Sequence, residues 1–220
     1  MKKLLFIALT FSLLAMKQDT PLKVIFFGDS ITQAGVGPTG YISKMKQLLE
    51  SKGLSTKYEL VGAGIGGNKV YDLYLRMEDD VLAKKPNVVF LYIGVNDVWH
   101  KRTYGTGTDL NKFEGFYTTI IKKLQAQNIK VIACTPAVIG ERTDFSNELD
   151  GDLNLYSQAI RNLVKKYNVP LCDLRKAFLD YNLQNNKDNK ESGILTTDRV
   201  HLNEAGNQFV AEQMMKLLVE

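Results

Sequence analysis

Short apolar runs alternate with longer amphipathic stretches, and this alternation constrains the fold more than any other feature of the chain. The apolar runs are rich in β-branched residues and predict strands over Lys23–Phe27, Tyr58–Val61, Val88–Ile93, Lys130–Cys134 and Leu171–Leu174. The other stretches have apolar residues every three to four positions and predict helices over Tyr41–Lys52, Val70–Lys85, Phe113–Gln127, Leu149–Tyr167 and Glu204–Leu218. Strands without polar alternation are typical of a parallel sheet covered on both faces. We therefore expect an α/β sandwich with right-handed crossovers.

The length and charge of the chain limit the classes of protein to which it can belong. Its 220 residues fit one domain, for which we expect residues 17–220, and no linker or internal repeat divides them. Lys and Arg number 28 and Asp and Glu 24, which gives a net charge of +4. A charge so close to balance, without a long basic run, argues against a nucleic-acid partner.

The N-terminal residues have the pattern of a secretory signal. Lys2 and Lys3 are followed by apolar and small residues from Leu4 to Ala15, a run shorter than the ~20 apolar residues of a membrane span. We expect residues 1–16 to be a signal peptide, and the mature chain to be periplasmic or extracellular without a stable membrane span. With Ala15 at position −1 of the cleavage site, the residue at position −3 is Leu13, which is not small. A hydrophobic segment that packs on the domain is therefore the alternative.

Cysteine and histidine are scarce, which limits metal chemistry. Cys134 and Cys172 are distant in sequence, no CxxC occurs, and the two His do not have the spacing of a ligand pair, so we expect no metal site. Both Cys lie in apolar runs that predict buried strands. We expect buried free thiols, and a disulfide is the alternative that export would permit.

Polar and glycine residues follow the predicted strands. The segments are Gly28–Thr32 (GDSIT), Gly62–Asn68 (GAGIGGN), Gly94–His100 (GVNDVWH) and Thr135–Glu141 (TPAVIGE), and Thr197–Gly206 (TDRVHLNEAG) leads into the last helix. The carboxyl ends of parallel strands meet at one edge of the sheet, where ligands bind in open α/β folds. The topology therefore predicts a functional site at this edge.

Five residues of these segments have the properties of an acyl-transfer site. Ser30 follows a strand at a sharp turn toward a helix, which exposes its Oγ. His201 and Asp198 supply a base and a carboxylate that orients it. Gly67 can present its backbone N–H, and Asn96 its side-chain amide, to a developing oxyanion. Each piece alone is also explained by a turn or a helix cap, but the five in this order favour catalysis.

This arrangement resembles the GDSL family of SGNH hydrolases. Phe27–Thr32 is similar to the first block of the family, GAGIGGN with Gly67 to the second, Gly94–Asp97 to the third and Asp198–His201 to the DxxH of the last. The resemblance extends from about Leu22 to the C-terminus, in the order and spacing of the family. It implies a three-layer α/β/α sandwich with a flavodoxin-like, five-stranded parallel sheet.

The resemblance also implies roles for the five residues. Ser30 would be the nucleophile, His201 the base and Asp198 its orienting carboxylate. The backbone N–H groups of Ser30 and Gly67 and the Asn96 amide would form the oxyanion hole. The expected reaction is hydrolysis of a carboxylic ester through an acyl-serine intermediate, which requires no metal or organic cofactor.

Three other classes of protein compete with this interpretation. The G-x-S-x-G elbow of the larger α/β-hydrolase fold does not occur. Gly62-x-Gly64-x-x-Gly67 matches the dinucleotide-binding fingerprint, but it follows the second strand, and the acidic residues Glu78–Asp80 lie inside the next helix. A non-catalytic ligand-binding protein on the same scaffold is the third alternative, and the complete set of five residues argues against it.

The substrate is predicted from the segments expected to wall the pocket, Trp99–Lys112 and Pro136–Glu148. They mix polar side chains with aromatic and apolar ones, which favours short-chain or carbohydrate acetyl esters as substrates. Trp99 and His100 are the candidate substrate contacts, and packing of the loop against the sheet is the alternative role of Trp99. A lysophospholipase or thioesterase of the same family is the alternative function, and it would require a longer apolar groove.

A second Asp-x-x-His array competes for the role of base. Asp97 and His100 have the same spacing as the C-terminal pair. We predict that His201 is the base, because Asn96 is assigned to the oxyanion side and the base must reach the serine from elsewhere. His100 would then line the substrate pocket or lie exposed.

Overall fold

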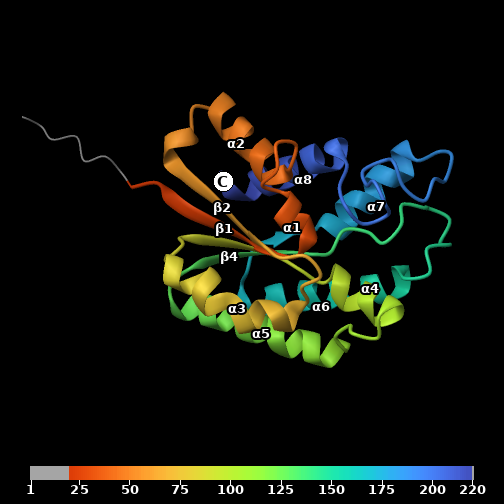
Figure 1. The fold of residues 1–220 in the computed structure, drawn as a ribbon, viewed down its shortest axis with the longest axis horizontal. Coiled ribbons are helices and arrows are strands. Elements are labelled where there is room, and N and C mark those ends of the chain that lie inside the picture. Colours follow the sequence, from red (N-terminus) through yellow and green to blue (C-terminus); the bar gives the residue numbers. More distant parts are fainter. Residues whose placement is uncertain (1–19, 220) are drawn as a thin grey trace, which may run out of the picture.

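A parallel sheet runs through the centre of the computed structural model, which describes residues 20–219 (Figure 1). Within these residues the sheet has five strands in the order β2-β1-β3-β4-β5, and every pairing is parallel. The strands are β1 (Leu22–Gly28), β2 (Tyr58–Gly64), β3 (Val88–Tyr92), β4 (Lys130–Cys134) and β5 (Leu171–Cys172). The predicted five-stranded parallel sheet is confirmed. The predicted signal peptide lies outside the described residues.

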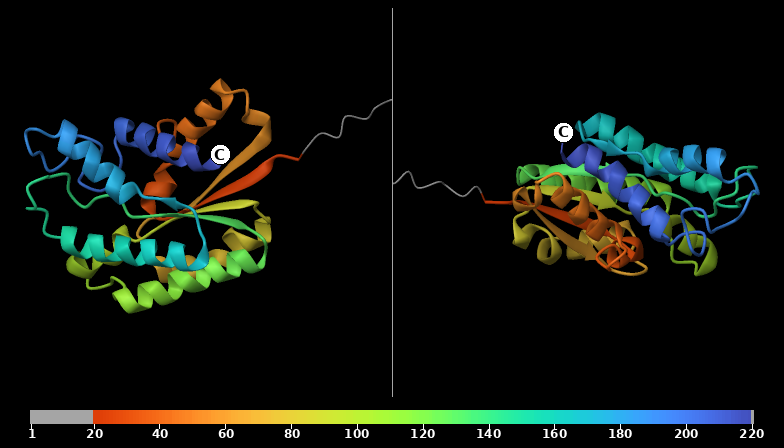
Figure 2. Two further views of the ribbon diagram at one scale, coloured as in Figure 1. Left: turned by 180° about the vertical axis from the view of Figure 1, so that it is seen from behind. Right: turned by 90° about the horizontal axis from the view of Figure 1, so that it is seen from above.

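Helices cover both faces of this sheet. α1 (Ser30–Ala34), α2 (Tyr41–Ser51), α7 (Leu174–Asn185) and α8 (Glu204–Leu218) lie on one face (Figures 1 and 2). α3 (Val70–Asp80), α4 (Val95–Thr103), α5 (Leu110–Ala126) and α6 (Asp150–Tyr167) lie on the other, and short 3₁₀ turns occupy Ser55–Lys57 and Leu82–Lys84. The fold is therefore the predicted three-layer α/β/α sandwich.

Helices α4 and α7 are absent from the sequence prediction, for identifiable reasons. The buried side of α4 includes the polar residues Asn96 and Asp97, so it shows no apolar periodicity. The second half of α4, from Trp99 to Thr103, occupies the start of the segment Trp99–Lys112, for which the sequence predicts a loop. α7 begins directly after β5 because the side chain of Asp173 accepts the backbone N–H of Lys176 and caps the helix, and this shortens the last strand relative to the prediction.

The core lies on both sides of the central strands. β1 and β3 supply the most deeply buried residues, including a stacked pair formed by Phe26 and Phe90, whose ring centroids are 5.0 Å apart. Cys134 and Cys172 are opposite each other in the register of β4 and β5, and both are buried free thiols, as expected. None of the helices within residues 20–219 has the length and apolar content of a membrane span.

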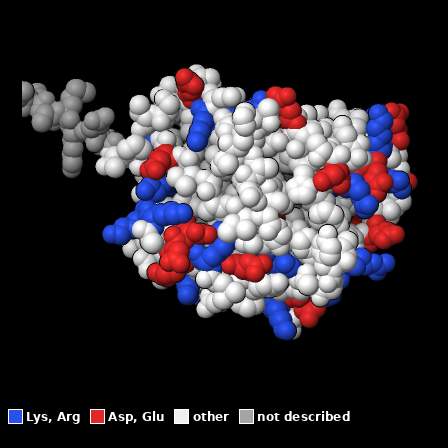
Figure 3. Space-filling view, in the orientation of Figure 1, with Lys and Arg blue, Asp and Glu red and all other residues white. Residues whose placement is uncertain are grey.

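Charges of both signs are interspersed on the surface. The face shown in Figure 3 has Lys and Arg next to Asp and Glu around an uncharged central area. The described residues contain no group of three metal-ligating side chains. On the face shown, Lys and Arg do not form an extended track.

Candidate active site

The candidate residues gather where the strand order reverses. The chain leaves β1 toward one face of the sheet and β3, its neighbour, toward the other. Ser30 begins α1 directly after β1, and Asn96 lies in the first turn of α4 after β3. In a sheet of this order the ligand crevice opens at this switch point, outside the carboxyl ends of the strands.

The turn before Ser30 is held by its neighbours. Asp29 is the N-cap of α1, and its buried carboxyl group accepts the backbone N–H of Ile31 at 3.0 Å. The end of β2 packs closely on the same turn, because a Cβ on Gly64 would lie 2.1 Å from the backbone nitrogen of Gln33. Only glycine fits there. Ser30 therefore starts from a backbone with little freedom.

Ser30, His201 and Asp198 form one hydrogen-bonded chain. The Ser30 Oγ is 2.9 Å from His201 Nε2, and His201 Nδ1 is 2.6 Å from Asp198 Oδ2. With the proton on Nδ1, the imidazole donates to Asp198 and accepts from the serine hydroxyl, as a general base requires. The other carboxylate oxygen of Asp198 accepts the backbone N–H groups of Val200 and His201, which fixes its direction.

The environment of Asp198 keeps it ionised. Partial burial acts to raise the pKa of this carboxyl group, but the hydrogen bonds from His201 and the backbone outweigh it, and the pKa lies below its usual value. Asp198 can therefore hold the imidazole as a carboxylate at neutral pH. About half of its side chain is exposed, so this end of the site is open to water.

Three candidate oxyanion donors follow β1, β2 and β3 along the chain. The N–H of Ser30 belongs to the first turn of α1 and has no intrahelical partner. Gly67 has φ +74°, a conformation that favours glycine, and its N–H has no acceptor among residues 20–219. Asn96 donates one N–H of its amide to the carbonyl of Asn68 at 3.1 Å and keeps the second available. These are the N–H groups that are expected to stabilise a tetrahedral oxyanion.

Arg76 anchors the loop that contains Gly67, a role that no sequence motif indicates. Its guanidinium donates to the carbonyl oxygens of Gly28 and Ala63, at the ends of β1 and β2, and to the Asn68 side chain. The guanidinium also stacks on the ring of Phe27, 4.6 Å from its centroid. One side chain therefore joins the strand that precedes Ser30 to the loop that contains Gly67.

Asp97 is a second anchor, whereas the sequence suggests only that it could pair with His100. Its carboxyl group is fully buried and accepts the N–H of Val70 at the start of α3, at 3.1 and 3.3 Å from its two oxygens. It forms no hydrogen bond with His100, so the competing Asp-x-x-His array does not form a dyad. Asp97 links α4 to the loop before α3.

Trp99, His100 and Tyr104 form a partly exposed aromatic group beside His201. The Trp99 and His201 rings are 6.4 Å apart, and the His100 and Tyr104 rings are 4.9 Å apart. These residues lie on α4 and at its end, not on the expected loop. From the second expected wall, Val138 is buried in the core and Phe145 is 95% exposed.

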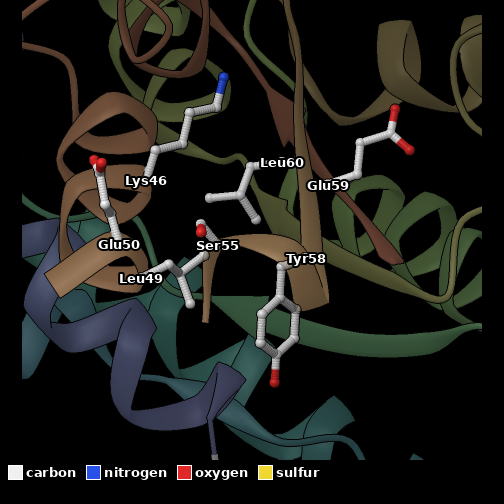
Figure 4. Close-up of a pocket in the computed structure, with 7 residues that line it drawn as sticks. All are labelled: Lys46, Leu49, Glu50, Ser55, Tyr58, Glu59 and Leu60. Atoms are coloured by element: carbon white, nitrogen blue, oxygen red, sulfur yellow. The ribbon is translucent and has the colours of Figure 1, made fainter. Parts of the chain in front are cut away.

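Two hollows open on the surface of the protein. One of about 460 Å³ lies between α2 and the start of β2 and is lined by Lys46, Leu49, Tyr58 and their neighbours (Figure 4). The other, of about 670 Å³, lies over α3 and α5 and includes Tyr71, Tyr74 and Phe116. Neither contains a member of the serine–histidine–aspartate chain.

Comparisons with known proteins identify the family of this chain. The model of the GDSL-like lipase/acylhydrolase family matches residues 26–209, which include all five candidate residues. An acetylxylan esterase from Geobacillus stearothermophilus is 27% identical over 91% of this chain and 95% of its own length. An uncharacterized lipoprotein from Bacillus subtilis (strain 168) is 25% identical over 86% of each chain.

Solved structures show the same similarity in three dimensions. The crystal structure of the acetyl xylan esterase AlAXEase has a TM-score of 0.89 and 64% identity, and the match covers 90% of this chain and 100% of that one. A crystal structure of an acetylxylan esterase from Geobacillus stearothermophilus has a TM-score of 0.79 and 26% identity, with 91% and 95% covered. The chain belongs to the GDSL-like lipase/acylhydrolase family, and it is a hydrolase of ester bonds.

Proposed function

We propose that this chain is a serine esterase that removes acetyl groups from xylan and its oligosaccharides, with Ser30 as nucleophile. The observation that carries the proposal is the hydrogen-bonded chain from Ser30 through His201 to Asp198, with distances of 2.9 and 2.6 Å. The substrate class is supported by the similarity to two acetylxylan esterases, one of which is 64% identical.

The geometry supports a two-step mechanism. His201 Nε2 takes the Ser30 proton while Oγ bonds to the acetyl carbon, and the carbonyl oxygen becomes an oxyanion facing Ser30, Gly67 and Asn96. The tetrahedral intermediate then breaks its bond to the sugar oxygen, which receives the proton from His201. Water repeats these steps on the acyl-serine and releases acetate. Asp198 stays ionised and holds the imidazolium.

The surroundings of the serine support a small acyl group on a carbohydrate. Trp99 lies beside His201, where a sugar ring on the leaving side could stack on its face. This aromatic side chain favours a carbohydrate acetyl ester over the long acyl chains of a lysophospholipase.

We also propose that the protein is exported. The segment from Lys2 to Ala15 has the pattern of a secretory signal, and one relative is described as a lipoprotein. Residues 17–220 would then be the mature single-domain enzyme. It would act outside the cytoplasm, where polymeric xylan is found.

Hydrolysis rates on nitrophenyl acetate, butyrate and decanoate, and acetate release from acetylated xylo-oligosaccharides, test the substrate class. We expect the fastest hydrolysis with acetate and measurable release from the oligosaccharides. A preference for decanoate would contradict the proposal. A fluorophosphonate should label wild type but not Ser30→Ala, and an unlabelled wild type would instead indicate a ligand-binding protein.

A further inference from the structure

The segment that carries Asp198 and His201 is a hairpin held at its base. Thr196 and Leu202 form an antiparallel bridge, and the Thr197 N–H donates to the His201 carbonyl at 2.8 Å. The turn between them places Arg199 at φ +83°, an unusual conformation for a residue with a side chain. The position of this hairpin relative to β1 determines whether His201 reaches Ser30.

A buried glutamate contacts the base of this hairpin. Glu141, in the segment after β4, is 1% exposed. Its Oε1 accepts the N–H groups of Leu195 and Thr196 at 2.6 and 3.0 Å, and its Oε2 accepts that of Ile194 at 2.9 Å. Three consecutive backbone donors therefore converge on one carboxylate.

The backbone around Glu141 continues this contact. Gly140 donates its N–H to the carbonyl of Arg199, inside the turn between Asp198 and His201, at 2.9 Å. The Glu141 N–H donates to Glu191, just before the hairpin, at 3.0 Å. Hydrogen bonds therefore join the segment after β4 to the hairpin region in three places. They are the Glu141 carboxylate, the carbonyl of Glu191 before the hairpin, and the carbonyl of Arg199 in its turn.

The two carboxyl oxygens of Glu141 accept hydrogen bonds only from the hairpin among residues 20–219. Glu141 forms no ion pair in this described part of the chain. A buried carboxylate without a cation requires strong hydrogen bonds, and three N–H donors supply them. Conversely, removing the carboxylate leaves three donors unpaired in the interior, which favours a shift of the hairpin.

We infer that Glu141 is a positioning residue, which holds the hairpin so that His201 Nε2 stays within hydrogen-bond distance of Ser30. It contacts no reacting atom. The inference rests on the proposed roles of Ser30, Asp198 and His201. A displacement of about 1 Å at a reacting group can lower turnover by about 100-fold, so a loosened hairpin should lower kcat far more than it changes KM.

The test is Glu141→Gln, which keeps the size of the side chain but turns an NH₂ toward an N–H of the hairpin. We expect kcat on nitrophenyl acetate to fall by about 10- to 100-fold with KM within about twofold of wild type. The far-downfield proton resonance of the His201–Asp198 hydrogen bond should broaden or disappear. Leu124→Ala, at a fully buried position of α5, is the control for general loss of stability.

The outcomes separate this inference from the proposed function. If Glu141→Gln loses activity only in proportion to its melting temperature, as Leu124→Ala does, the positioning role is wrong. The same holds if His201→Ala is inactive while Glu141→Gln keeps wild-type kcat and resonance. Full activity of His201→Ala would instead overturn the proposed catalytic roles. If Glu141→Gln does not fold, Glu141→Asp, which keeps the charge on a shorter side chain, is evaluated by the same criteria.

Discussion

Asp97 makes the stability of this fold depend on pH in an unusual direction. Burial raises the pKa of its carboxyl group to about 7, against the opposing effects of the Val70 N–H and of Lys69. Burial likewise raises the pKa of Asp29, next to Ser30, to about 7, and the negative charge of Asp97 raises it further. Asp97→Asn removes one of these ionisations while keeping an oxygen that can accept the Val70 N–H.

The magnitude follows from the difference in pKa between the unfolded and folded chains. The ordinary value is 3.8 and the folded value about 7, so the shift of roughly three pH units corresponds to about 4 kcal/mol. Between pH 4 and 7 the folded chain keeps a proton on Asp97 that the unfolded chain has lost. The free energy of unfolding of wild type therefore falls as the pH rises from 4 to about 7. Asn cannot ionise, so the Asp97→Asn variant should not show this fall.

Urea unfolding at pH 4.5, 6 and 7.5 measures this effect. Relative to wild type, the free energy of unfolding of Asp97→Asn should increase by about 3 kcal/mol from pH 4.5 to pH 7.5. Asp109→Asn is the control, because a hydrogen bond from Lys101 lowers the pKa of this exposed carboxyl group, which is then ionised in both states above pH 5. Parallel curves for wild type and Asp97→Asn would refute the reasoning.

Three further predictions concern the site. Asn96→Ala should lower kcat by about 10²–10³-fold with little change in KM, and a kcat within about twofold of wild type would remove Asn96 from the oxyanion hole. His201→Ala should lower kcat by several orders of magnitude in steady-state assays, whereas His100→Ala should act mainly on KM; the reverse pattern would exchange their roles. Arg76→Met leaves the hydrogen bonds to two strand-end carbonyls unmade and should cost about 3 kcal/mol in urea unfolding, and a loss below about 1 kcal/mol would contradict its anchoring role.

The elements of the sheet and its main helices could be predicted because their signals are local. β1 and β3 are continuous apolar runs, since both faces of a central strand are buried. α5 is recognisable because one of its faces packs on the sheet and the other meets water. α4 escaped prediction because its buried positions include Asn96 and Asp97, whose burial depends on partners outside the helix.

The reactive residue types could also be read from the sequence, because motifs at strand ends converge in a parallel sheet. The side chains and backbone groups with which these residues pair could not be predicted from the sequence. Asp97 and Asp198 stand at the same spacing from a histidine, yet Asp97 turns to α3 and Asp198 bonds His201, since the surrounding backbone decides where each carboxylate points. Glu141 binds donors more than fifty residues away. The local pattern along the chain determined the secondary structure and the chemistry available, whereas the packing of distant segments decided which charges are buried and which groups meet.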